Sequence, residues 1–463
     1  MVVGEFTQET DLLVIGGGPG GYHAAFRAAQ HGIQTTIIES MPKLGGVCLH
    51  RGCIPSKTYL SIAETLYTAA TAKSMGVDFG KPKLDVDGIR KWKEQVVSKL
   101  AGGLDMQCKK FKVDRVTGTA RFEDSKHVGI EGGDVRRIKF RRCIIATGSR
   151  SIELKGVQIE SPRVLTSRTA LDMQDIPKTL LVIGGGYIGI ELGQVFAGFG
   201  SKVTVVEMLP GILPGADRDL VRPLLKRVEE EFAEICLETK VVSMKDTKTA
   251  IELGFEGKNP PKTTKFDKVL VCVGRRPNSA DLNLASAGVQ VDQRGFIKVD
   301  AEFQTTTPRI YAIGDVIGNP MLAHKAMHEG MVLADRLAGK NVVFEPRAIP
   351  AVVFSDPAIA WAGYTESEAK EKGIDIKITK LPWSASGRAV AIGRTDGVTK
   401  LIFDKKTERL IGIGLCGPHA GEMISEGVLA MEMGAVAFDL ETTIHPHPTL
   451  SETIGEAAAM FGV

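Results

Sequence analysis

The feature that most constrains this chain is a motif that it carries twice. Both copies place three glycines in the pattern Gly-x-Gly-x-x-Gly after an apolar run, and both end in a glutamate. The first copy holds Gly16, Gly18, Gly21 and Glu39, and the second holds Gly184, Gly186, Gly189 and Glu207. Each residue of the second copy follows its counterpart by 168 positions. Chance agreement at four positions is improbable, so we predict two copies of one structural unit.

The expected unit is a strand, a tight glycine turn, a helix and a second strand. The glycines permit close approach of the backbone, and the helix N-terminus offers unpaired N–H groups to a pyrophosphate. An acid about 20 residues after the turn suits the hydroxyls of an adenosine ribose. One copy could instead be structural and have lost its ligand, but both keep their glycines and their acid. We therefore predict two dinucleotide sites.

A second feature is the pair Cys48 and Cys53 in the stretch GGVCLHRGCIPS, which is typical of a helix start. Residues i and i+4 share a helix face, so a modest distortion would bring residues i and i+5 within the ~7 Å between Cα atoms that a disulfide needs. Half a zinc site and two unconnected core thiols are the alternatives. No second closely spaced cysteine pair follows to complete four ligands. We therefore favour a redox dithiol.

Composition narrows the class of protein. With 463 residues, about three or four domains are expected. Lys and Arg number 58 and Asp and Glu 55, so the charge of +3 gives no reason to expect nucleic acid or an anionic membrane as partner. The N-terminus MVVGEFTQE lacks the features of a signal peptide, and no uncharged apolar run reaches the ~18 residues of a membrane span. Seven cysteines indicate a reducing compartment, the cytoplasm.

The pattern of the remaining chain completes the predicted fold class. Short β-rich segments follow each glycine motif, and a later apolar run, expected to be a strand, ends at Asp315. From about Ala348 strands and helices alternate without a glycine-rich loop, as in an α+β domain. The prediction is an α/β protein with two Rossmann-like dinucleotide-binding domains and a C-terminal α+β dimerisation domain.

The last motif is His445-Pro-His447-Pro, which is followed by Glu452 and an apolar helix over Thr453–Phe461. The two imidazoles could bind a metal, although a third ligand is not obvious. Thr449 and Glu452 also fit a capping box, which would make the acid a helix start. The functional alternative is a base near the dithiol that is held by a carboxylate. Spacing alone leaves these alternatives open.

Together the stretches GGVCLHRGCIPSK, YAIGD and HPHPTLSE and the two glycine loops make the chain resemble the class I pyridine nucleotide–disulfide oxidoreductase family over essentially its whole length. The resemblance implies an FAD-binding domain at 1–149, an NAD-binding domain at 150–278, a central domain at 279–347 and a dimer-interface domain at 348–463. It implies FAD and NAD as cofactors, no metal, and a homodimer.

The activity implied by the resemblance is oxidation of protein-bound dihydrolipoamide to lipoamide with reduction of NAD. The partners would be the lipoyl domains and core acyltransferase of a 2-oxo acid dehydrogenase complex. The alternatives are another disulfide reductase of the family, similar to glutathione reductase, and a mainly structural subunit of such a complex. Glutathione reductase-like members use NADPH and usually have basic residues where Glu207 stands.

The resemblance also implies roles for single residues. Cys48 and Cys53 would form the redox disulfide, with Cys48 exchanging with the substrate and Cys53 facing the flavin. Lys57 would lie near the flavin N5 and pair with Glu191. His447 would be the base, oriented by Glu452 and supplied by the partner subunit.

The further cofactor contacts would come from strand ends and loops. Asp315 would bind the ribityl chain, and the backbone of Ala323 would approach the isoalloxazine. The other expected contacts are Gly46, Gly118, Thr147, Gly148, Val241 and Gly274. The chain departs from the family pattern at His50 and Ser386, because asparagine is usual at both positions.

Overall fold

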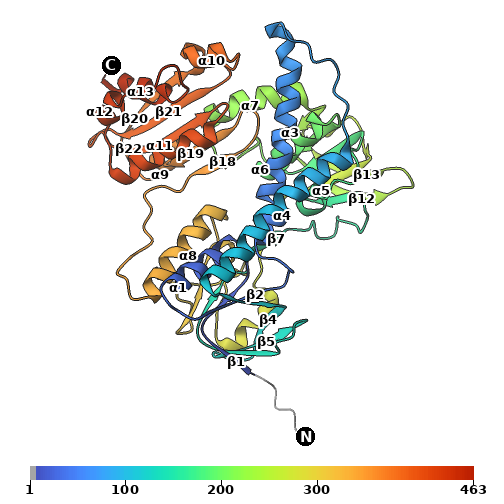
Figure 1. The fold of residues 1–463 in the computed structure, drawn as a ribbon. Helices are drawn as coiled ribbons and strands as arrows, with labels where there is room; N and C mark the ends of the chain where they lie inside the picture. The colour runs from blue at the N-terminus through green and yellow to red at the C-terminus, as the bar shows by residue number, and fades with distance from the viewer. Residues whose placement is uncertain (1–6, 463) are drawn as a thin grey trace. The chain divides into compact units, whose positions relative to one another are not determined.

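The computed structural model describes residues 7–462. The first six residues, on which part of the signal-peptide expectation falls, and Val463 lie outside the described residues. The chain divides into two compact units. The first unit comprises the chain up to Thr58, Asp87–Ile152 and Gly274–Glu345, and the second comprises Tyr59–Val86, Glu153–Val273 and the chain from Pro346 onward. The chain crosses into the second unit within α3 (Cys53–Thr71) and returns at the start of α4 (Val86–Phe111) (Figure 1).

The first unit is built on a seven-stranded sheet in the order β3–β2–β1–β6–β5–β4, with β17 pairing with β6. Its strands are β1 (Thr7–Ile15), β2 (Thr35–Glu39), β3 (Asp114–Thr117), β4 (Thr119–Phe122), β5 (His127–Glu131), β6 (Arg137–Ile145) and β17 (Ile310–Ala312). The pairs β6–β5 and β5–β4 are antiparallel, and the other pairs are parallel. β2 is buried along its whole length, as a strand inside a parallel sheet should be.

Helices α1 (Pro19–Gln30) and α8 (Ala323–Leu337) pack side by side on one face of this sheet (Figure 1). Leu12 and Val14 of β1 face these helices, whereas Leu13 and Ile15 belong to the core on the opposite face. This alternation is the two-residue period of a strand. A small antiparallel ribbon joins β7 (Ser149–Ser151) to β16 (Arg275–Pro277).

The second unit holds a parallel sheet in the order β11–β10–β9–β15–β8. Its strands are β8 (Val164–Thr166), β9 (Thr179–Ile183), β10 (Lys202–Val206), β11 (Glu234–Cys236) and β15 (Lys268–Val271). Its helices are α5 (Ser167–Leu171), α6 (Tyr187–Gly198) and α7 (Arg218–Glu231). A separate antiparallel sheet contains β12 (Thr239–Asp246), β13 (Ile251–Gly257) and β14 (Lys265–Phe266).

The C-terminal part of the second unit is a five-stranded antiparallel sheet in the order β18–β19–β22–β21–β20. The strands are β18 (Ala351–Val353), β19 (Ile359–Gly363), β20 (Ile376–Pro382), β21 (Val398–Asp404) and β22 (Leu410–Cys416). The helices are α9 (Glu366–Glu371), α10 (Gly387–Ala391), α11 (Ala420–Met433), α12 (Ala437–Thr442) and α13 (Glu452–Ala459).

The sequence repeat is a structural repeat. Helix α6 begins and ends 168 positions after α1, and each helix follows a buried parallel strand and a glycine turn. Pro19 opens α1 at a position where its missing N–H costs nothing. The predicted fold class, α/β with two Rossmann-like units and a C-terminal α+β region, is confirmed.

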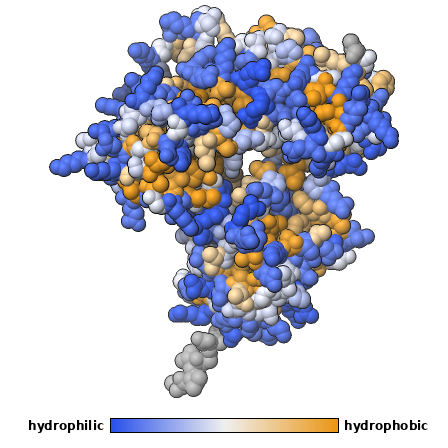
Figure 2. Space-filling model, turned by 180° about the vertical axis from the view of Figure 1, so that it is seen from behind, coloured by the Kyte–Doolittle hydropathy of each residue, from blue (hydrophilic) through white to orange (hydrophobic). Residues whose placement is uncertain are grey.

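The surface carries apolar patches between hydrophilic regions on the face that Figure 2 displays. Large exposed apolar side chains of the C-terminal region are Leu429, Met433, Phe438, Ile444 and Met460. None of the helices in the described part of the chain combines the length and apolarity that a membrane span requires.

Candidate active site

The two glycine loops share one backbone geometry. Gly16 has φ +106° and Gly184 has φ +108°, a backbone conformation that residues with a side chain rarely adopt. A Cβ on Gly16 would lie 2.4 Å from the carbonyl oxygen of Ala146, and one on Gly184 would lie 2.5 Å from that of Cys272. Both loops therefore need glycine at the turn for conformational and for packing reasons.

The other glycines of the motif divide into two kinds. A Cβ on Gly21 would lie 1.9 Å from the Gly16 carbonyl oxygen, and one on Gly189 would lie 2.1 Å from that of Gly184, so these two glycines serve helix packing. Gly18 and Gly186 have an ordinary φ of −75°, and a Cβ there would meet no protein atom closer than 4.0 Å. Packing within the protein does not explain these two. A dinucleotide lying against the backbone does, so both loops fit such a ligand.

Each acid at the strand end is tied back to its own loop. Glu39 accepts hydrogen bonds from the N–H of Gly17 at 2.8 Å and of Met41 at 2.9 Å. Glu207 accepts from the N–H of Gly185 at 2.7 Å and of Leu209 at 2.8 Å. Each carboxylate keeps further lone pairs, because two oxygens can accept about four hydrogen bonds. Both acids are thus fixed beside the loop as acceptors, where the motif predicts a ribose.

The dithiol starts directly against the first glycine loop. The N–H of Gly45 donates to the carbonyl oxygen of Gly17 at 2.7 Å. Gly46 has φ +57°, and a Cβ there would lie 2.6 Å from the Cα of Gly18. The expected single helix start is two helices, α2 (Gly46–Arg51) and α3, which are separated at Gly52. This break is the distortion that lets side chains five positions apart meet.

Cys48 and Cys53 are present as thiols whose side chains share a hydrogen bond. The contact with Cys53 and then burial raise the pKa of the Cys48 thiol above its ordinary value, while the Lys57 ammonium opposes the shift. The two thiols therefore lie within hydrogen-bonding reach of each other. Tyr22 of α1 lies near both thiols: burial first, and then the two cysteines, raise its pKa to about 12.

Asp315 follows β17 in a short helical turn, Gly314–Ile317. Ser149 Oγ donates a hydrogen bond to Asp315 Oδ2. Arg275 in turn donates to Ser149 Oγ at 2.8 Å and to the Ser149 carbonyl oxygen at 2.7 Å. Ser149 and Arg275 are site residues that sequence reasoning missed, because their contact joins the two strands of a ribbon 126 positions apart.

The turn that carries Asp315 is also held from α8. The N–H of Gly314 donates to Glu329 Oε2 at 2.7 Å, and Glu329 pairs with Lys325 at 2.5 Å. Both side chains are buried. An acid and a lysine four positions apart on one helix were a visible signal for this pair. Ala323 is the first residue of α8, and the preceding Leu322 has no side chain able to cap it. The approach of the Ala323 backbone to the isoalloxazine stays a prediction.

The predicted contacts Thr147 and Gly148 lie in the loop after β6. Thr147 Oγ1 donates to the carbonyl oxygen of Asn278 at 2.8 Å, and the Asn278 amide returns a bond to the Thr147 carbonyl at 2.9 Å. Asn278 is a further residue that sequence reasoning missed. The remaining predicted contacts are placed as follows: Gly118 between β3 and β4, Gly274 before β16, and Val241 buried in β12.

The predicted base is held by the predicted carboxylate. His447 Nδ1 lies 2.8 Å from Glu452 Oε1, and the N–H of Thr449 donates to Glu452 Oε2 at 2.7 Å. The bond from Thr449 and then the contact with His447 lower the pKa of Glu452, which keeps it anionic. Thr449 Oγ1 donates to the Pro446 carbonyl instead of capping the helix, so the capping box is incomplete. With Nδ1 engaged as donor, Nε2 of His447 is the free acceptor.

His445 has a different environment. Its Nε2 lies 2.6 Å from Glu426 Oε1, and its Nδ1 lies 3.0 Å from the Thr443 carbonyl oxygen. A Cβ on Gly455 would lie 3.1 Å from the His445 ring, so α13 packs closely against it. The two imidazoles are bound to separate carboxylates, and His445 has the contacts of a structural residue.

Glu191 lies on α6 and is 3% exposed. Its Oε1 accepts a hydrogen bond from the N–H of Phe354 at 3.0 Å. Lys57 belongs to the first unit and Glu191 to the second, and their pairing stays a prediction.

The two departures from the family pattern have local structural roles. His50 Nε2 lies 2.8 Å from the Leu44 carbonyl oxygen, which ties α2 to the preceding loop. Ser386 precedes α10, and its Oγ accepts from the N–H of Ala389, which is an N-cap. Each replacement thus still supplies a hydrogen bond to its own turn.

One acidic cluster in the described chain has the spacing of metal ligands: Asp217, Asp219 and Glu366. Lys400 pairs with Asp217 at 2.6 Å, with Asp219 at 3.1 Å and with Glu366. A buried ammonium therefore supplies the positive charge at this place.

Two dinucleotide loops, with a thiol pair set against the first, define a flavin-dependent disulfide oxidoreductase. Residues 10–330 match the pyridine nucleotide-disulphide oxidoreductase family, and residues 349–458 match the dimerisation domain of that family. The chain belongs to this family, and the resemblance predicted from sequence is confirmed.

Its relatives include several enzymes of one name. It is 44% identical to the dihydrolipoyl dehydrogenase of Vibrio cholerae, over 98% of this chain and 96% of that protein. It is also 44% identical to that of Geobacillus stearothermophilus, over 99% and 97%. Among solved structures, LpdA from Mycobacterium tuberculosis is similar with a TM-score of 0.90 at 25% identity, covering 97% of this chain and 99% of that one. The flavoprotein disulfide reductase RclA from Escherichia coli has a TM-score of 0.87 at 29% identity, covering 97% and 100%.

Proposed function

We propose that this protein oxidises protein-bound dihydrolipoamide to lipoamide and reduces NAD to NADH. The enzyme uses FAD at the first glycine loop and NAD at the second. One observation carries the proposal: the segment of the thiol pair begins on the FAD loop, where Gly45 bonds to Gly17 and Gly46 touches Gly18. FAD, when bound there, supplies a two-electron acceptor that can pass a hydride to NAD.

The chain's own residues perform the thiol chemistry. Nε2 of His447 takes the proton of one dihydrolipoyl thiol, and Glu452 stabilises the resulting imidazolium. The thiolate attacks Cys48 in the oxidised pair and displaces the Cys53 thiolate. His447 returns this proton to the leaving Cys48 sulfur and takes the proton of the second substrate thiol. The second thiolate attacks the substrate sulfur of the mixed disulfide, lipoamide is released, and Cys48 leaves as a thiol. In the reduced pair, Cys48 would carry the proton and Cys53 the negative charge.

The protonated state of the Cys48 thiol makes a base necessary. The contact with Cys53 and then burial raise the pKa of the Cys48 thiol and so favour its protonated form, whereas the thiolate is the reactive species in exchange. His447 moves this proton in both directions of the reaction. Lys57 and Glu191 are assigned to the ion pair beside the flavin, and Asp315 and Ala323 to cofactor binding.

We further propose a homodimer in which His447 serves the partner's dithiol. His447 is 79% exposed at its side chain, and the neighbouring Ile444 is 95% exposed. An exposed apolar residue beside an exposed catalytic base suits a surface that a second subunit covers. The lipoyl domains and core acyltransferase of a 2-oxo acid dehydrogenase complex would be the further partners. A cytoplasmic location fits a chain with seven cysteines and no disulfide framework in its sequence.

Steady-state turnover tests the proposal. Free dihydrolipoamide should be oxidised with NAD and far less efficiently with NADP, because Glu207 would repel a 2′-phosphate. A repulsion of about 1–4 kcal/mol corresponds to roughly 5-fold to 1000-fold in kcat/KM. Glu207→Gln should narrow the difference. Equal kcat/KM values for both cofactors would refute the assignment of Glu207.

The same assay separates the alternatives. Reduction of glutathione disulfide with NADPH in place of lipoamide turnover would support a glutathione reductase-like enzyme. Absence of turnover in the FAD-loaded protein would support a mainly structural subunit.

A further inference from the structure

Helix α6 is fastened to a short segment of the C-terminal region, Phe354–Asp356. Glu191 and Gln194 lie one turn apart on α6 and therefore share a face. Glu191 Oε1 accepts from the N–H of Phe354 at 3.0 Å. Gln194 Oε1 accepts from the N–H of Asp356 at 2.8 Å, and its Nε2 donates to the Asp356 carbonyl oxygen at 2.9 Å. Three backbone groups of the segment are thus hydrogen-bonded to two side chains of one helix.

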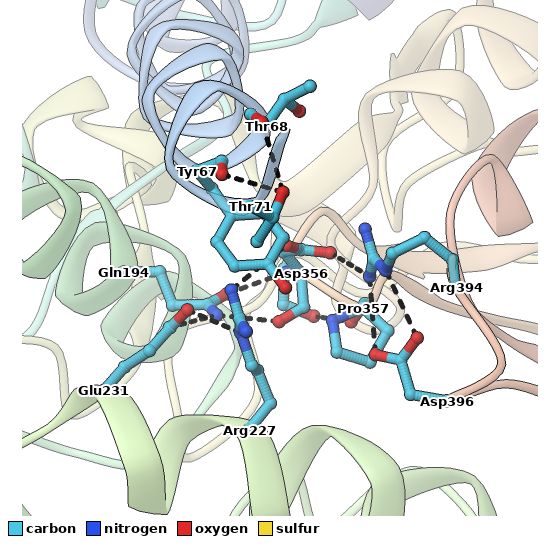
Figure 3. A network of polar contacts seen from close by, with 11 residues as sticks. Tyr67, Thr68, Thr71, Gln194, Arg227, Glu231, Asp356, Pro357, Arg394 and Asp396 are labelled. Carbon is cyan, nitrogen blue, oxygen red and sulfur yellow. Dashed lines mark hydrogen bonds and ion pairs between the residues drawn. The ribbon is translucent and has the colours of Figure 1, made fainter. Parts of the chain in front are cut away.

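The side chain of Asp356 fixes the other side of this segment. Its Oδ1 lies 2.5 Å from Arg394 Nη2, and its Oδ2 lies 3.7 Å from Arg227 Nη2 (Figure 3). Arg227 stacks on the Tyr67 ring with 3.7 Å between guanidinium carbon and ring centroid. One carboxylate therefore connects the segment to two guanidinium groups from different parts of the second unit.

Two further acids, Glu231 and Asp396, bond to the same two arginines. Glu231 bonds to Arg227 at 2.6 Å and accepts from Gln194 Nε2 at 2.9 Å. Burial raises the pKa of Glu231, against the contacts with Gln194 and Arg227. At the edge of the network, Asp396 Oδ1 lies 3.2 Å from Arg394 Nε, and the Asp396 side chain is 42% exposed. Asp356 is the acid of this cluster that belongs to the fastened segment.

We propose that Asp356 is a positioning residue for Glu191: its carboxylate holds Phe354–Asp356 in register on α6, so that the Phe354 N–H stays on the Glu191 carboxylate. This inference rests on the proposed function, in which Glu191 acts beside the flavin. A hydrogen bond to the charged form of an acid favours that form and fixes its place. Loss of the Asp356 charge removes the ion pairs that tie the segment to Arg394 and Arg227, which keep only Asp396 and Glu231, and Glu191 loses its fixed donor.

The test compares Asp356→Asn, Glu191→Gln and the double variant, with Asp396→Asn as the matched control. Asp396 bonds to the same Arg394, whereas the contacts to the segment Phe354–Asp356 described above come from other residues. The readouts are the reduction potential of the bound flavin, measured by equilibrium dye titration, kcat and KM for dihydrolipoamide, and the melting temperature.

Asp356→Asn should shift the potential in the same direction as Glu191→Gln and lower kcat about threefold or more, with KM changed less than twofold. The double variant should equal Glu191→Gln alone, because residues acting through one contact are not additive. Asp396→Asn should leave potential and kcat unchanged. Additive effects of Asp356→Asn and Glu191→Gln would overturn the proposal, as would a wild-type potential in Asp356→Asn.

Two further outcomes are distinguishable. If Glu191→Gln itself changes neither potential nor kcat, the role of Glu191 in the proposed function fails. If Asp356→Asn melts too early to assay, Gln194→Glu replaces it, because this change removes the donor to the Asp356 carbonyl and leaves both arginines paired. Its potential should shift as in Glu191→Gln, and an unshifted potential would overturn the proposal.

Discussion

At the scale of the residue, the chemistry depends on where one proton lies in the thiol pair. The contact with Cys53 and then partial burial raise the pKa of the Cys48 thiol, so we propose that Cys48 holds the proton and Cys53 the negative charge. The two cysteines are therefore not interchangeable. The one that exchanges with substrate needs a base, and the other is already suited to hold negative charge.

Replacing Cys53 tests this division. Cys53→Ser should keep FAD but lose lipoamide turnover and the long-wavelength band that appears on two-electron reduction, because serine cannot supply a thiolate at neutral pH. Absorbance during anaerobic NADH titration measures the band. Cys48→Ser should lose turnover but keep the band, and a band that persists in Cys53→Ser would reverse the assignment.

A second residue-scale prediction concerns pH. Asp335 bonds to Arg27 at 2.7 Å and to His31 at 2.5 Å, which holds α8 to α1. The bond to Arg27 first, and then that to His31, lower the pKa of Asp335 well below its ordinary value. A lowered pKa contributes stability that is complete above the unfolded value, about 4, and is lost as pH falls through the folded value.

Asp335→Asn should therefore lower the unfolding free energy by about 1–3 kcal/mol at pH 7, and the difference from wild type should shrink below about pH 4. Denaturant titrations at several pH values measure it. Glu9→Gln breaks the exposed pair with Lys139 and should change little at any pH. A deficit that is the same at pH 3 and pH 7 would contradict the ion-pair explanation.

At the scale of the element, the two glycine turns show that one motif serves two purposes. Gly189 has no room for a side chain because the Gly184 carbonyl oxygen occupies that place, whereas Gly186 has open space and an ordinary φ. Gly189→Ala should lower the melting temperature by several degrees. Gly186→Ala should melt like wild type and raise KM for NAD about tenfold or more, because a methyl group would meet the pyrophosphate. An unchanged KM in Gly186→Ala would show that this glycine does not face the ligand.

Much of the element pattern could be predicted from the sequence. Short strands such as Thr119–Phe122 and His127–Glu131 follow the first glycine motif, as expected, and the repeat placed a helix after each glycine turn, α1 and α6. The break at Gly52 could not be predicted, because an isolated glycine in a helical pattern is usually tolerated.

The supports of the site were equally hidden. Ser149 and Arg275 meet through pairing of two short strands, and Glu329 reaches Gly314 because α8 packs against that turn. Such contacts depend on the three-dimensional arrangement and leave no local spacing. Local motifs therefore revealed the groups proposed for chemistry, and the fold revealed what holds them.

At the scale of the whole molecule, the proposed dimer makes a quantitative prediction. A Cys48→Ser chain and a His447→Ala chain are mixed, unfolded and refolded. Half the dimers should be mixed, each with one intact and one doubly damaged site, so activity should return to about one quarter of wild type. Refolded wild type gives the reference value. If each site is complete within one chain, mixing restores nothing.

The interleaving of the two units has a consequence for synthesis on the ribosome. The first unit needs β17 and α8, which follow the entire parallel sheet of the second unit in the chain. Until they emerge, the end of β6 lacks one neighbour and the apolar face of α1 lacks its cover. Elongation at about 5–20 residues per second makes this interval roughly 10–40 s long. The nascent chain therefore carries an unfinished sheet edge during translation, the state in which chaperone contact matters most.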